Sequence, residues 1–253
     1  MLMRENATTG LGAGSGLGLG RSMAPAKLTL SLRVVGVRTD GFHLLESEMV
    51  SISLADELEF IEGDGLEVVG NGAVPDDDSN LVRRALRATG RTAHVRLHKR
   101  IPMGGGLGGG STDAAAVLRW AGVTDLTLAA SLGADVPFCL RGGRAMVGGI
   151  GEVVESLPFV DRVFTLLTPP FGVFTPAVYR AWDELGGPRA EGPNDLEPAA
   201  LEVEPRLAEW RGRFAAATGA VPVLAGSGAT WFVEGTFDGP GFVHVRTLPA
   251  EAT

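Results

Sequence analysis

The chain has 253 residues, of which 45% are hydrophobic and 21% charged, so it can bury a sizeable core as one large domain or two closely packed lobes. Its formal net charge of −8 argues against nucleic acid and anionic membrane as partners, because both attract basic surfaces. Cys139 is the only cysteine, which excludes an intramolecular disulfide framework and favours a reducing, cytoplasmic setting.

The first 22 residues contain the glycine-dense tract GLGAGSGLGLG at 10–20. No frame of this tract gives G-x-G-x-x-G and no strand-like run precedes it, so we interpret 1–22 as a flexible extension rather than as a phosphate loop. Beyond Met23 the pattern changes. Apolar and polar residues alternate at 28–33, 49–61 and 93–97, which predicts half-buried strands, and helical spacing at 81–88 predicts a helix.

The second half of the chain also mixes helices and strands. We predict helices at 126–132 and 199–217, short buried segments at 136–140 and 145–147, and strands at 162–167, 221–224 and 230–233. Neither a regular βαβ alternation nor a repeat is present, so the pattern favours an α+β fold. No apolar run reaches about 18 residues, so we expect no membrane-spanning helix.

The strongest functional signal is the loop PMGGGLGGGST at 102–112, which leads directly into the helix-forming run AAAVL at 114–118. Six of the nine residues from Gly104 to Thr112 are glycine, and without Cβ atoms the backbone N–H groups can approach a ligand closely. A loop that opens a helix also concentrates N–H donors and the positive end of the helix dipole on one spot. A phosphate group is therefore the expected ligand, and a tight loop without a ligand is the alternative.

Two common phosphate loops fit this segment poorly. Gly104, Gly106 and Gly109 satisfy G-x-G-x-x-G, but a Rossmann fold also needs an acidic residue about 20 residues further on, at the end of a second strand. Asp125 is nearer than that and lies outside any strand pattern. A Walker A loop places Lys before Ser or Thr, whereas Gly is the residue before Ser111 here.

Seven motifs in register resemble the 4-diphosphocytidyl-2-C-methyl-D-erythritol kinases, a family of the GHMP kinase superfamily, over nearly everything from Ala24 to Val233. The motifs are APAKLTL at 24–30, DGFH at 40–43, PMGGGLGGGSTDAAA at 102–116, LGADVPF at 132–138, GIGE at 149–152, NDLE at 194–197 and AGSGAT at 225–230.

This resemblance implies a two-lobed GHMP kinase fold of the α+β class, with mixed sheets and a glycine-rich phosphate loop opening a helix. The N-terminal lobe would span 23–155 and hold the ATP loop, and the C-terminal lobe would span 156–253. The implied activity is ATP-dependent phosphorylation of the 2-hydroxyl of 4-diphosphocytidyl-2-C-methyl-D-erythritol, in the methylerythritol phosphate pathway of isoprenoid precursor biosynthesis.

In that family the lysine of APAK and the aspartate of GADVP are the catalytic pair, and the matching residues are Lys27 and Asp135. An alcohol is a poor nucleophile, so a carboxylate that accepts its proton and a cation that stabilises phosphoryl charge suit this reaction. Taken alone, Lys27 would be interpreted as a solvated lysine at a strand end, and Asp135 as a helix or turn cap.

The resemblance also implies nucleotide contacts from the glycine loop, from the lysine before it and from an asparagine upstream. The matching ATP-binding residues are Asn80, Lys99, Pro102, Met103, Gly104, Gly105, Gly106, Leu107, Gly108, Gly109, Gly110, Ser111 and Thr112. ATP and Mg²⁺ are the expected cofactors. We assign no metal ligands, although the hydroxyl of Ser111 or Thr112 would suit Mg²⁺, and both hydroxyls would equally serve as helix caps.

For the acceptor, relatives grip the cytidine with the aromatic residue and histidine of a DGYH-type motif and with a second aromatic after a Thr-Pro pair. An aromatic sandwich suits a flat pyrimidine, because stacking uses the face of the ring. Phe42 replaces the usual tyrosine, and a threonine stands at 29 where relatives usually carry asparagine. The expected substrate-binding residues are Thr29, Asp40, Phe42, His43, Thr175 and Tyr179.

Three other functions remain open on the sequence. The first alternative is another GHMP kinase, of the homoserine or mevalonate type, and the two kinds of enzyme differ at the DGFH motif and at Tyr179. A catalytically inactive nucleotide-binding homologue is the second alternative, against which intact Lys27 and Asp135 argue. A Rossmann dehydrogenase is the third and lacks its motif context. We expect a monomer or homodimer that binds a small molecule and neither nucleic acid nor membrane.

Overall fold

The computed structural model describes residues 18–70, 75 and 77–250. Up to position 17, the expected flexible extension lies outside these residues. At 18–22 the expectation was wrong, because these residues begin the first strand of the main sheet. Gly18 pairs with Ile61 and Ser22 with Leu58, so β2 provides hydrogen-bond partners along one edge of this backbone.

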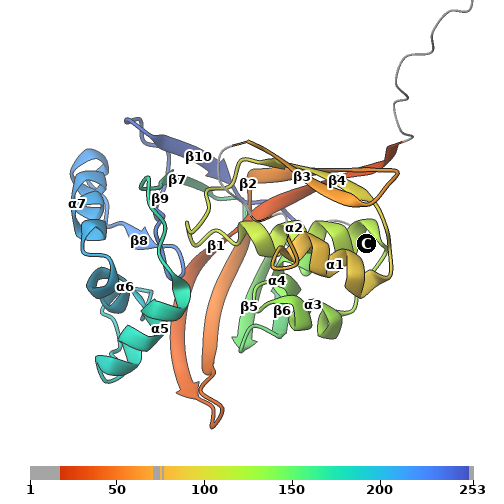
Figure 1. Cartoon of the computed structure of the whole chain (residues 1–253). Helices are drawn as coiled ribbons and strands as arrows, with labels where there is room; N and C mark the ends of the chain where they lie inside the picture. The colour runs from red at the N-terminus through yellow and green to blue at the C-terminus, as the bar shows by residue number, and fades with distance from the viewer. Residues whose placement is uncertain (1–17, 71–74, 76, 251–253) are drawn as a thin grey trace, which may run out of the picture.

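The larger sheet is mixed and has six strands, in the order β3-β4-β2-β5-β6 with β1 paired to β2. β3 and β4 are parallel and the other pairs are antiparallel. β1 and β2 form a long hairpin that runs through the middle of the molecule between the two groups of helices (Figure 1). The strands are β1 (Gly18–Val37), β2 (His43–Ile61), β3 (Gly65–Gly70), β4 (His94–Lys99), β5 (Arg144–Gly149) and β6 (Val153–Leu157).

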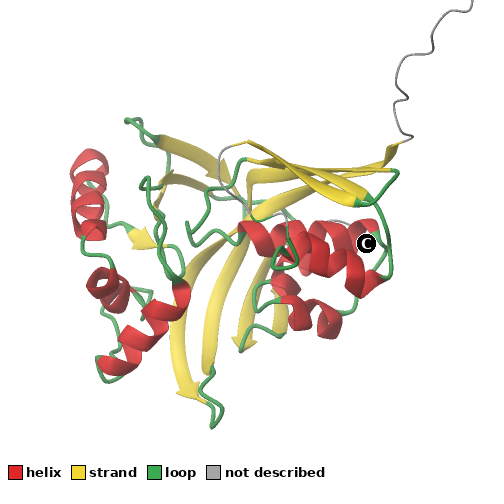
Figure 2. Cartoon of the chain, in the orientation of Figure 1, coloured by secondary structure: helices red, strands yellow, loops and turns green. Residues whose placement is uncertain are grey.

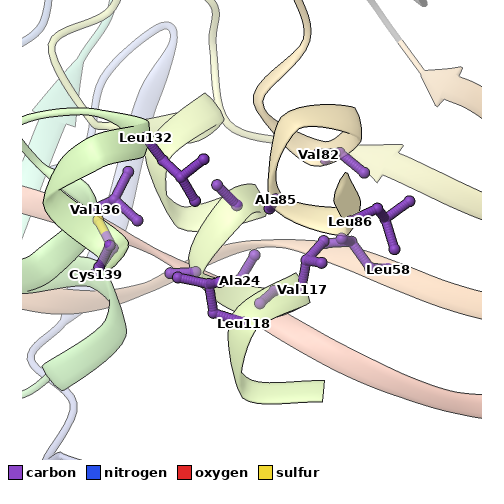
Figure 3. Close-up of a cluster of buried hydrophobic side chains, with 14 of the residues drawn as sticks. Ala24, Leu58, Val82, Ala85, Leu86, Val117, Leu118, Leu132, Val136 and Cys139 are labelled. Carbon is purple, nitrogen blue, oxygen red and sulfur yellow. The ribbon is translucent and has the colours of Figure 1, made fainter. Parts of the chain in front are cut away.

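Four helices pack against this sheet on one side of the hairpin: α1 (Leu81–Thr89), α2 (Gly109–Trp120), α3 (Leu126–Leu132) and α4 (Val136–Arg141) (Figure 2). The centre of their packing is α2, whose residues from Thr112 to Leu118 are all buried. Burial raises the pKa of the Cys139 thiol to about 12, so this cysteine is an inert core residue. Figure 3 shows part of the cluster, with Ala24, Leu58, Val82, Ala85, Leu86, Val117, Leu118, Leu132, Val136 and Cys139 labelled.

The smaller sheet is antiparallel, in the order β10-β7-β9-β8. The helix expected at 199–217 is two helices, because Pro205 has no N–H to continue the first and restricts the residue before it. The elements of this half are β7 (Val163–Leu167), α5 (Thr175–Glu184), α6 (Glu197–Val203), α7 (Arg206–Thr218), β8 (Val223–Leu224), β9 (Trp231–Glu234) and β10 (Phe242–Arg246).

A shared core joins the two halves. Leu28 of β1 and Ile52 of β2 belong to the same buried cluster as Phe164 of β7 and Phe232 of β9. The α+β fold with a mixed main sheet is therefore confirmed, and the β1–β2 hairpin packs against strands of the smaller sheet. Among the residues that the structure describes, no helix combines the length and apolar composition needed to cross a membrane.

Candidate active site

A cavity of about 830 Å³ lies between the glycine loop, the β1–β2 hairpin and α5. This volume is typical of small-molecule sites. Both expected catalytic residues and most of those expected to bind ATP or acceptor line it, namely Lys27, Thr29, Phe42, His43, Asn80, Lys99, all of 102–111, Asp135, Thr175 and Tyr179. The tertiary structure thus brings segments from both halves of the chain to one space.

The expected catalytic pair meets in this cavity. Lys27 is only 5% exposed and projects from β1 on the same face as Thr29, because side chains two apart on a strand share a face. Its Nζ donates to Thr29 Oγ1 over 3.0 Å and lies 3.5 Å from Asp135 Oδ2. A buried ammonium therefore faces a partly exposed carboxylate.

Asp135 occupies the N-cap position of α4, but its side chain makes no capping hydrogen bond. The carboxylate instead approaches Lys27. Burial, and then the Asp135 charge, raise the pKa of the Tyr179 phenol well above its usual value. Asp135 therefore acts electrostatically on Tyr179 as well as on Lys27.

The glycine loop packs directly against Lys27. The Lys27 backbone N–H donates to Leu107 O over 3.1 Å, and a Cβ on Gly108 would lie 2.7 Å from Lys27 Cγ. Gly108 also adopts φ +70°, a conformation that favours glycine, and no side chain caps α2, which begins at Gly109. The first backbone N–H groups of α2 therefore lack intrahelical acceptors next to Lys27.

The loop also interlocks with the second glycine segment, at 225–230. Gly104 O accepts from Ala229 N over 3.0 Å and Gly105 O accepts from Thr230 N over 3.1 Å. A Cβ on Gly106 would lie 2.0 Å from Ala225 O. The motif AGSGAT thus braces the glycine loop, a contact that the sequence did not reveal.

Thr112 and Asp40 are not brought to the cavity. Thr112 is fully buried, and its hydroxyl donates to Pro25 O over 2.6 Å, because the turn of α2 points it at β1. Asp40 is exposed, and its carboxylate accepts from Arg38 and from the Phe42 N–H, which shapes the turn between β1 and β2. Ser111 is the loop hydroxyl that lines the cavity.

Asn80 and Lys99 line the cavity, and their polar groups already bind other residues of the chain. Asn80 Oδ1 accepts from Val82 N over 2.8 Å as the N-cap of α1, and its Nδ2 donates to Pro75 O over 2.7 Å. The Lys99 ammonium is enclosed by two carboxylates, those of Asp56 and Asp113. No sequence pattern indicated these partners.

One side of the cavity is built by α5 against the β1–β2 hairpin. The Nε2 of His43 lies 2.8 Å from Asp183 Oδ1, and its ring centroid lies 4.7 Å from that of Tyr179. Thr175 Oγ1 and Ser227 Oγ are 2.7 Å apart, and both residues line the cavity. Asp183 and Ser227 were missed: Ser227 lies within AGSGAT, but no local pattern marks Asp183.

Asn194 of the NDLE motif holds the second glycine segment in place. Its Nδ2 donates to Leu224 O over 2.8 Å and to Gly226 O over 2.7 Å, and its Oδ1 accepts from Leu196 N. Because Gly226 lies against the Lys27 ammonium, Asn194 supports the position of Lys27 indirectly.

Comparison with known proteins identifies the family. The model of the GHMP kinases N terminal domain matches residues 80–143. A 4-diphosphocytidyl-2-C-methyl-D-erythritol kinase of Paramagnetospirillum magneticum is 40% identical over 248 residues, which cover 83% of this chain and 86% of that protein. The chain belongs to the 4-diphosphocytidyl-2-C-methyl-D-erythritol kinase family. Another kinase of this family, from Pelotomaculum thermopropionicum, is 39% identical over 251 residues, covering 83% of this chain and 87% of that one.

Solved structures agree with membership of the 4-diphosphocytidyl-2-C-methyl-D-erythritol kinase family. A crystal structure of a 4-(cytidine 5'-diphospho)-2C-methyl-D-erythritol kinase superposes with a TM-score of 0.69 at 37% identity, over 84% of this chain and 89% of that chain. A homoserine kinase from Cytophaga hutchinsonii superposes with a TM-score of 0.58 at 19% identity, over 92% of this chain and 88% of that chain. The second match shows the GHMP kinase fold alone.

Proposed function

We propose that this protein transfers the γ-phosphoryl group of ATP to the 2-hydroxyl of 4-diphosphocytidyl-2-C-methyl-D-erythritol. The observation that carries this proposal is the approach of Lys27 Nζ to Asp135 Oδ2, 3.5 Å apart, beside an uncapped helix N-terminus in one cavity. The names of the relatives supply the substrate, and the geometry of this chain supplies the chemistry.

In the proposed reaction, Asp135 accepts the proton of the acceptor hydroxyl as its oxygen attacks the γ-phosphorus. The bond between that phosphorus and the bridging oxygen breaks, and ADP leaves with the electron pair. The Lys27 ammonium opposes the negative charge on the transferring group, from a site where burial strengthens electrostatic interactions. The reaction therefore needs one proton acceptor and one fixed cation, which this pair provides.

The glycine loop is the proposed triphosphate site. The backbone N–H groups at the start of α2, from Gly109 to Ser111, have no intrahelical acceptors, so they are available to phosphate oxygens. The rigid contact with 225–230 keeps these donors in place, so little ordering remains to be done when the nucleotide binds.

Mg²⁺ is the proposed companion of ATP, and the residues present fit it. No three His, Cys, Asp or Glu side chains gather as a metal cluster within 18–70, 75 and 77–250, but Mg²⁺ bound to phosphates keeps several waters and needs few protein ligands. When bound, it would neutralise phosphate charge. Ser111, which lines the cavity at the loop, is the hydroxyl that would hold it.

The acceptor side suits a flat base. Tyr179 and His43 present neighbouring rings, and Phe42 lines the same cavity while 56% exposed, so it is available to cover a ligand. Aromatic faces of this kind stack on a pyrimidine. An acceptor without a ring, such as homoserine or mevalonate, would leave these faces unused.

The test is ADP release with three acceptors offered in turn: the cytidine-linked methylerythritol, homoserine and mevalonate. We expect ADP only with the first. Asp135→Asn should lower kcat by about 10²–10⁴-fold, the usual contribution of a general base, while the Kd for ATP measured by calorimetry stays within about threefold. Phosphorylation of another alcohol, or unchanged turnover of Asp135→Asn, would contradict the proposal.

A further inference from the structure

Beneath the glycine loop lies a buried charge cluster of Lys99, Asp56 and Asp113. Lys99 ends β4, Asp56 lies in β2 and Asp113 lies in α2. The Lys99 ammonium donates to Asp113 Oδ2 over 2.8 Å and also to Asp56 Oδ2. The side chains of Lys99, Asp113 and Asp56 are 5%, 3% and 0% exposed, respectively, so water contributes little to this arrangement.

Each carboxylate of the cluster is attached to a different end of the loop. Asp56 Oδ1 accepts from Arg100 N over 2.5 Å and from Ile101 N over 2.8 Å, where the chain enters the loop. Asp113 lies in the first turns of α2, where the chain leaves it. Lys99 therefore connects the entry and the exit of the loop through one ammonium.

The Lys99 ammonium is positioned to support the loop. A Cβ on Gly109 would lie 3.2 Å from Lys99 Nζ, so the lysine lies directly against the first residue of α2. Two of its three N–H donors are taken by the carboxylates. The loop it supports contains six glycines, which have the largest backbone freedom to lose on ordering.

Stability alone does not explain why charged groups occupy this buried site. One cation faces two buried carboxyl groups, and Asp113 Oδ1 has no hydrogen-bond partner among the described residues. Burial raises the pKa of Asp113 to about 7. A well-packed apolar group at the same place would often be at least as stabilising, so retention of the charges is consistent with a positioning role.

We propose that Lys99 is a positioning residue that fixes both ends of the phosphate loop through Asp56 and Asp113, rather than a nucleotide contact. This inference rests on the proposed function only in taking the loop as the ATP site. It replaces the expectation that the side chain of Lys99 contacts the nucleotide. The loop is then already ordered in the free protein, before ATP binds.

The test measures hydrogen exchange of the free protein, with neither nucleotide nor metal added. The reporters are the amides of Ile101 at the entry and Thr112 at the exit, both hydrogen-bonded in the structure. Lys99→Met should speed exchange about tenfold at both ends, since each end loses its link to the other. Asp113→Ala should speed it mainly at Thr112, and Asp56→Asn mainly at Ile101.

Glu48→Ala is the matched control, because Glu48 also lies in β2 and pairs with Arg144 over 2.7 Å without touching the loop. Its exchange at both reporters should equal that of the native protein. If Lys99→Met does not fold, the Asp113→Ala and Asp56→Asn variants provide the test, because in each variant Lys99 stays paired with the remaining carboxylate.

ATP affinity separates the two roles of Lys99. The positioning role predicts that Asp113→Ala both loosens Thr112 in the free protein and weakens ATP binding about tenfold by calorimetry. A direct contact predicts native exchange in the free protein with weakened ATP binding in Lys99→Met, and that result would overturn the inference. Because the exchange experiment contains no acceptor and no turnover, failure of the proposed kinase activity would leave its outcome unaffected.

Discussion

The Thr29 hydroxyl accepts a hydrogen bond of 3.0 Å from the Lys27 ammonium, and both side chains are buried. This bond fixes the ammonium at a place 3.5 Å from Asp135. Threonine at this position thus orients the Lys27 side chain within β1, in addition to lining the cavity.

Thr29→Val should lower kcat roughly tenfold, because a hydrogen bond to a charged group contributes about 1.5–3 kcal/mol and its loss releases the ammonium from its position. Thr29→Ser keeps the hydroxyl and should stay within about threefold of the native rate. Initial rates of ADP formation at saturating substrates measure both. Equal rates for the valine and serine variants would show that this bond does not orient Lys27.

Gly106→Ala should prevent the phosphate loop from docking on the second glycine segment. The new Cβ would lie 2.0 Å from Ala225 O, and φ is +74°, so both sterics and backbone conformation oppose it. We expect a loss of more than about 2 kcal/mol in the free energy of unfolding, together with weakened ATP binding. Urea unfolding and calorimetry measure the two effects.

Gly212→Ala is the control for that substitution. Gly212 lies in α7, its Cβ would meet nothing within 4 Å, and its backbone is helical. This change should stabilise the protein by about 0.5–1 kcal/mol, since alanine loses less backbone freedom than glycine in a helix. If both glycine variants behaved alike, the docking of the loop on Ala225 would not be a constraint.

Asp183→Ala should weaken binding of the acceptor without affecting ATP. Asp183 lies 2.8 Å from His43 Nε2 and fixes the orientation of a ring that packs against Tyr179. Loss of that partner should raise the KM for the acceptor about tenfold and leave the KM for ATP unchanged. The neighbouring exposed Glu184 lies outside the cavity lining, so Glu184→Ala should leave both constants unchanged. A selective rise in the KM for ATP would refute this role.

Asp113 makes stability depend on pH. Burial raises its pKa from 3.8 to about 7, so between these values the folded protein holds a proton that the unfolded chain has released. The free energy of unfolding contributed by this group is therefore highest at low pH and falls as pH rises towards about 7.

Asp113→Asn removes this titration, so the native protein should lose stability relative to the variant as pH rises from about 4 to about 7. Urea unfolding of both proteins across that interval gives the difference, in which the titrations shared by both proteins cancel. A difference that is constant with pH would mean that Asp113 titrates in its usual range.

The amino-acid sequence by itself determined the local elements of this protein. The period-2 run at 28–33 lies within β1, the helical spacing at 81–88 lies within α1, and the segment 126–132 is helix α3 at the predicted bounds. The glycine loop and the helix after it were equally evident, because glycine content and helix propensity act over a few neighbouring residues. The motifs also indicated the family and contain most of the residues that line the cavity.

Only the tertiary structure decided which of these residues meet. It placed the Thr112 hydroxyl against Pro25 O, and it enclosed the Lys99 ammonium between two carboxylates. It also placed Ala225 against Gly106. Such contacts join segments far apart in the chain, and they depend on how whole sheets and helices pack, so no local pattern of residues encodes them.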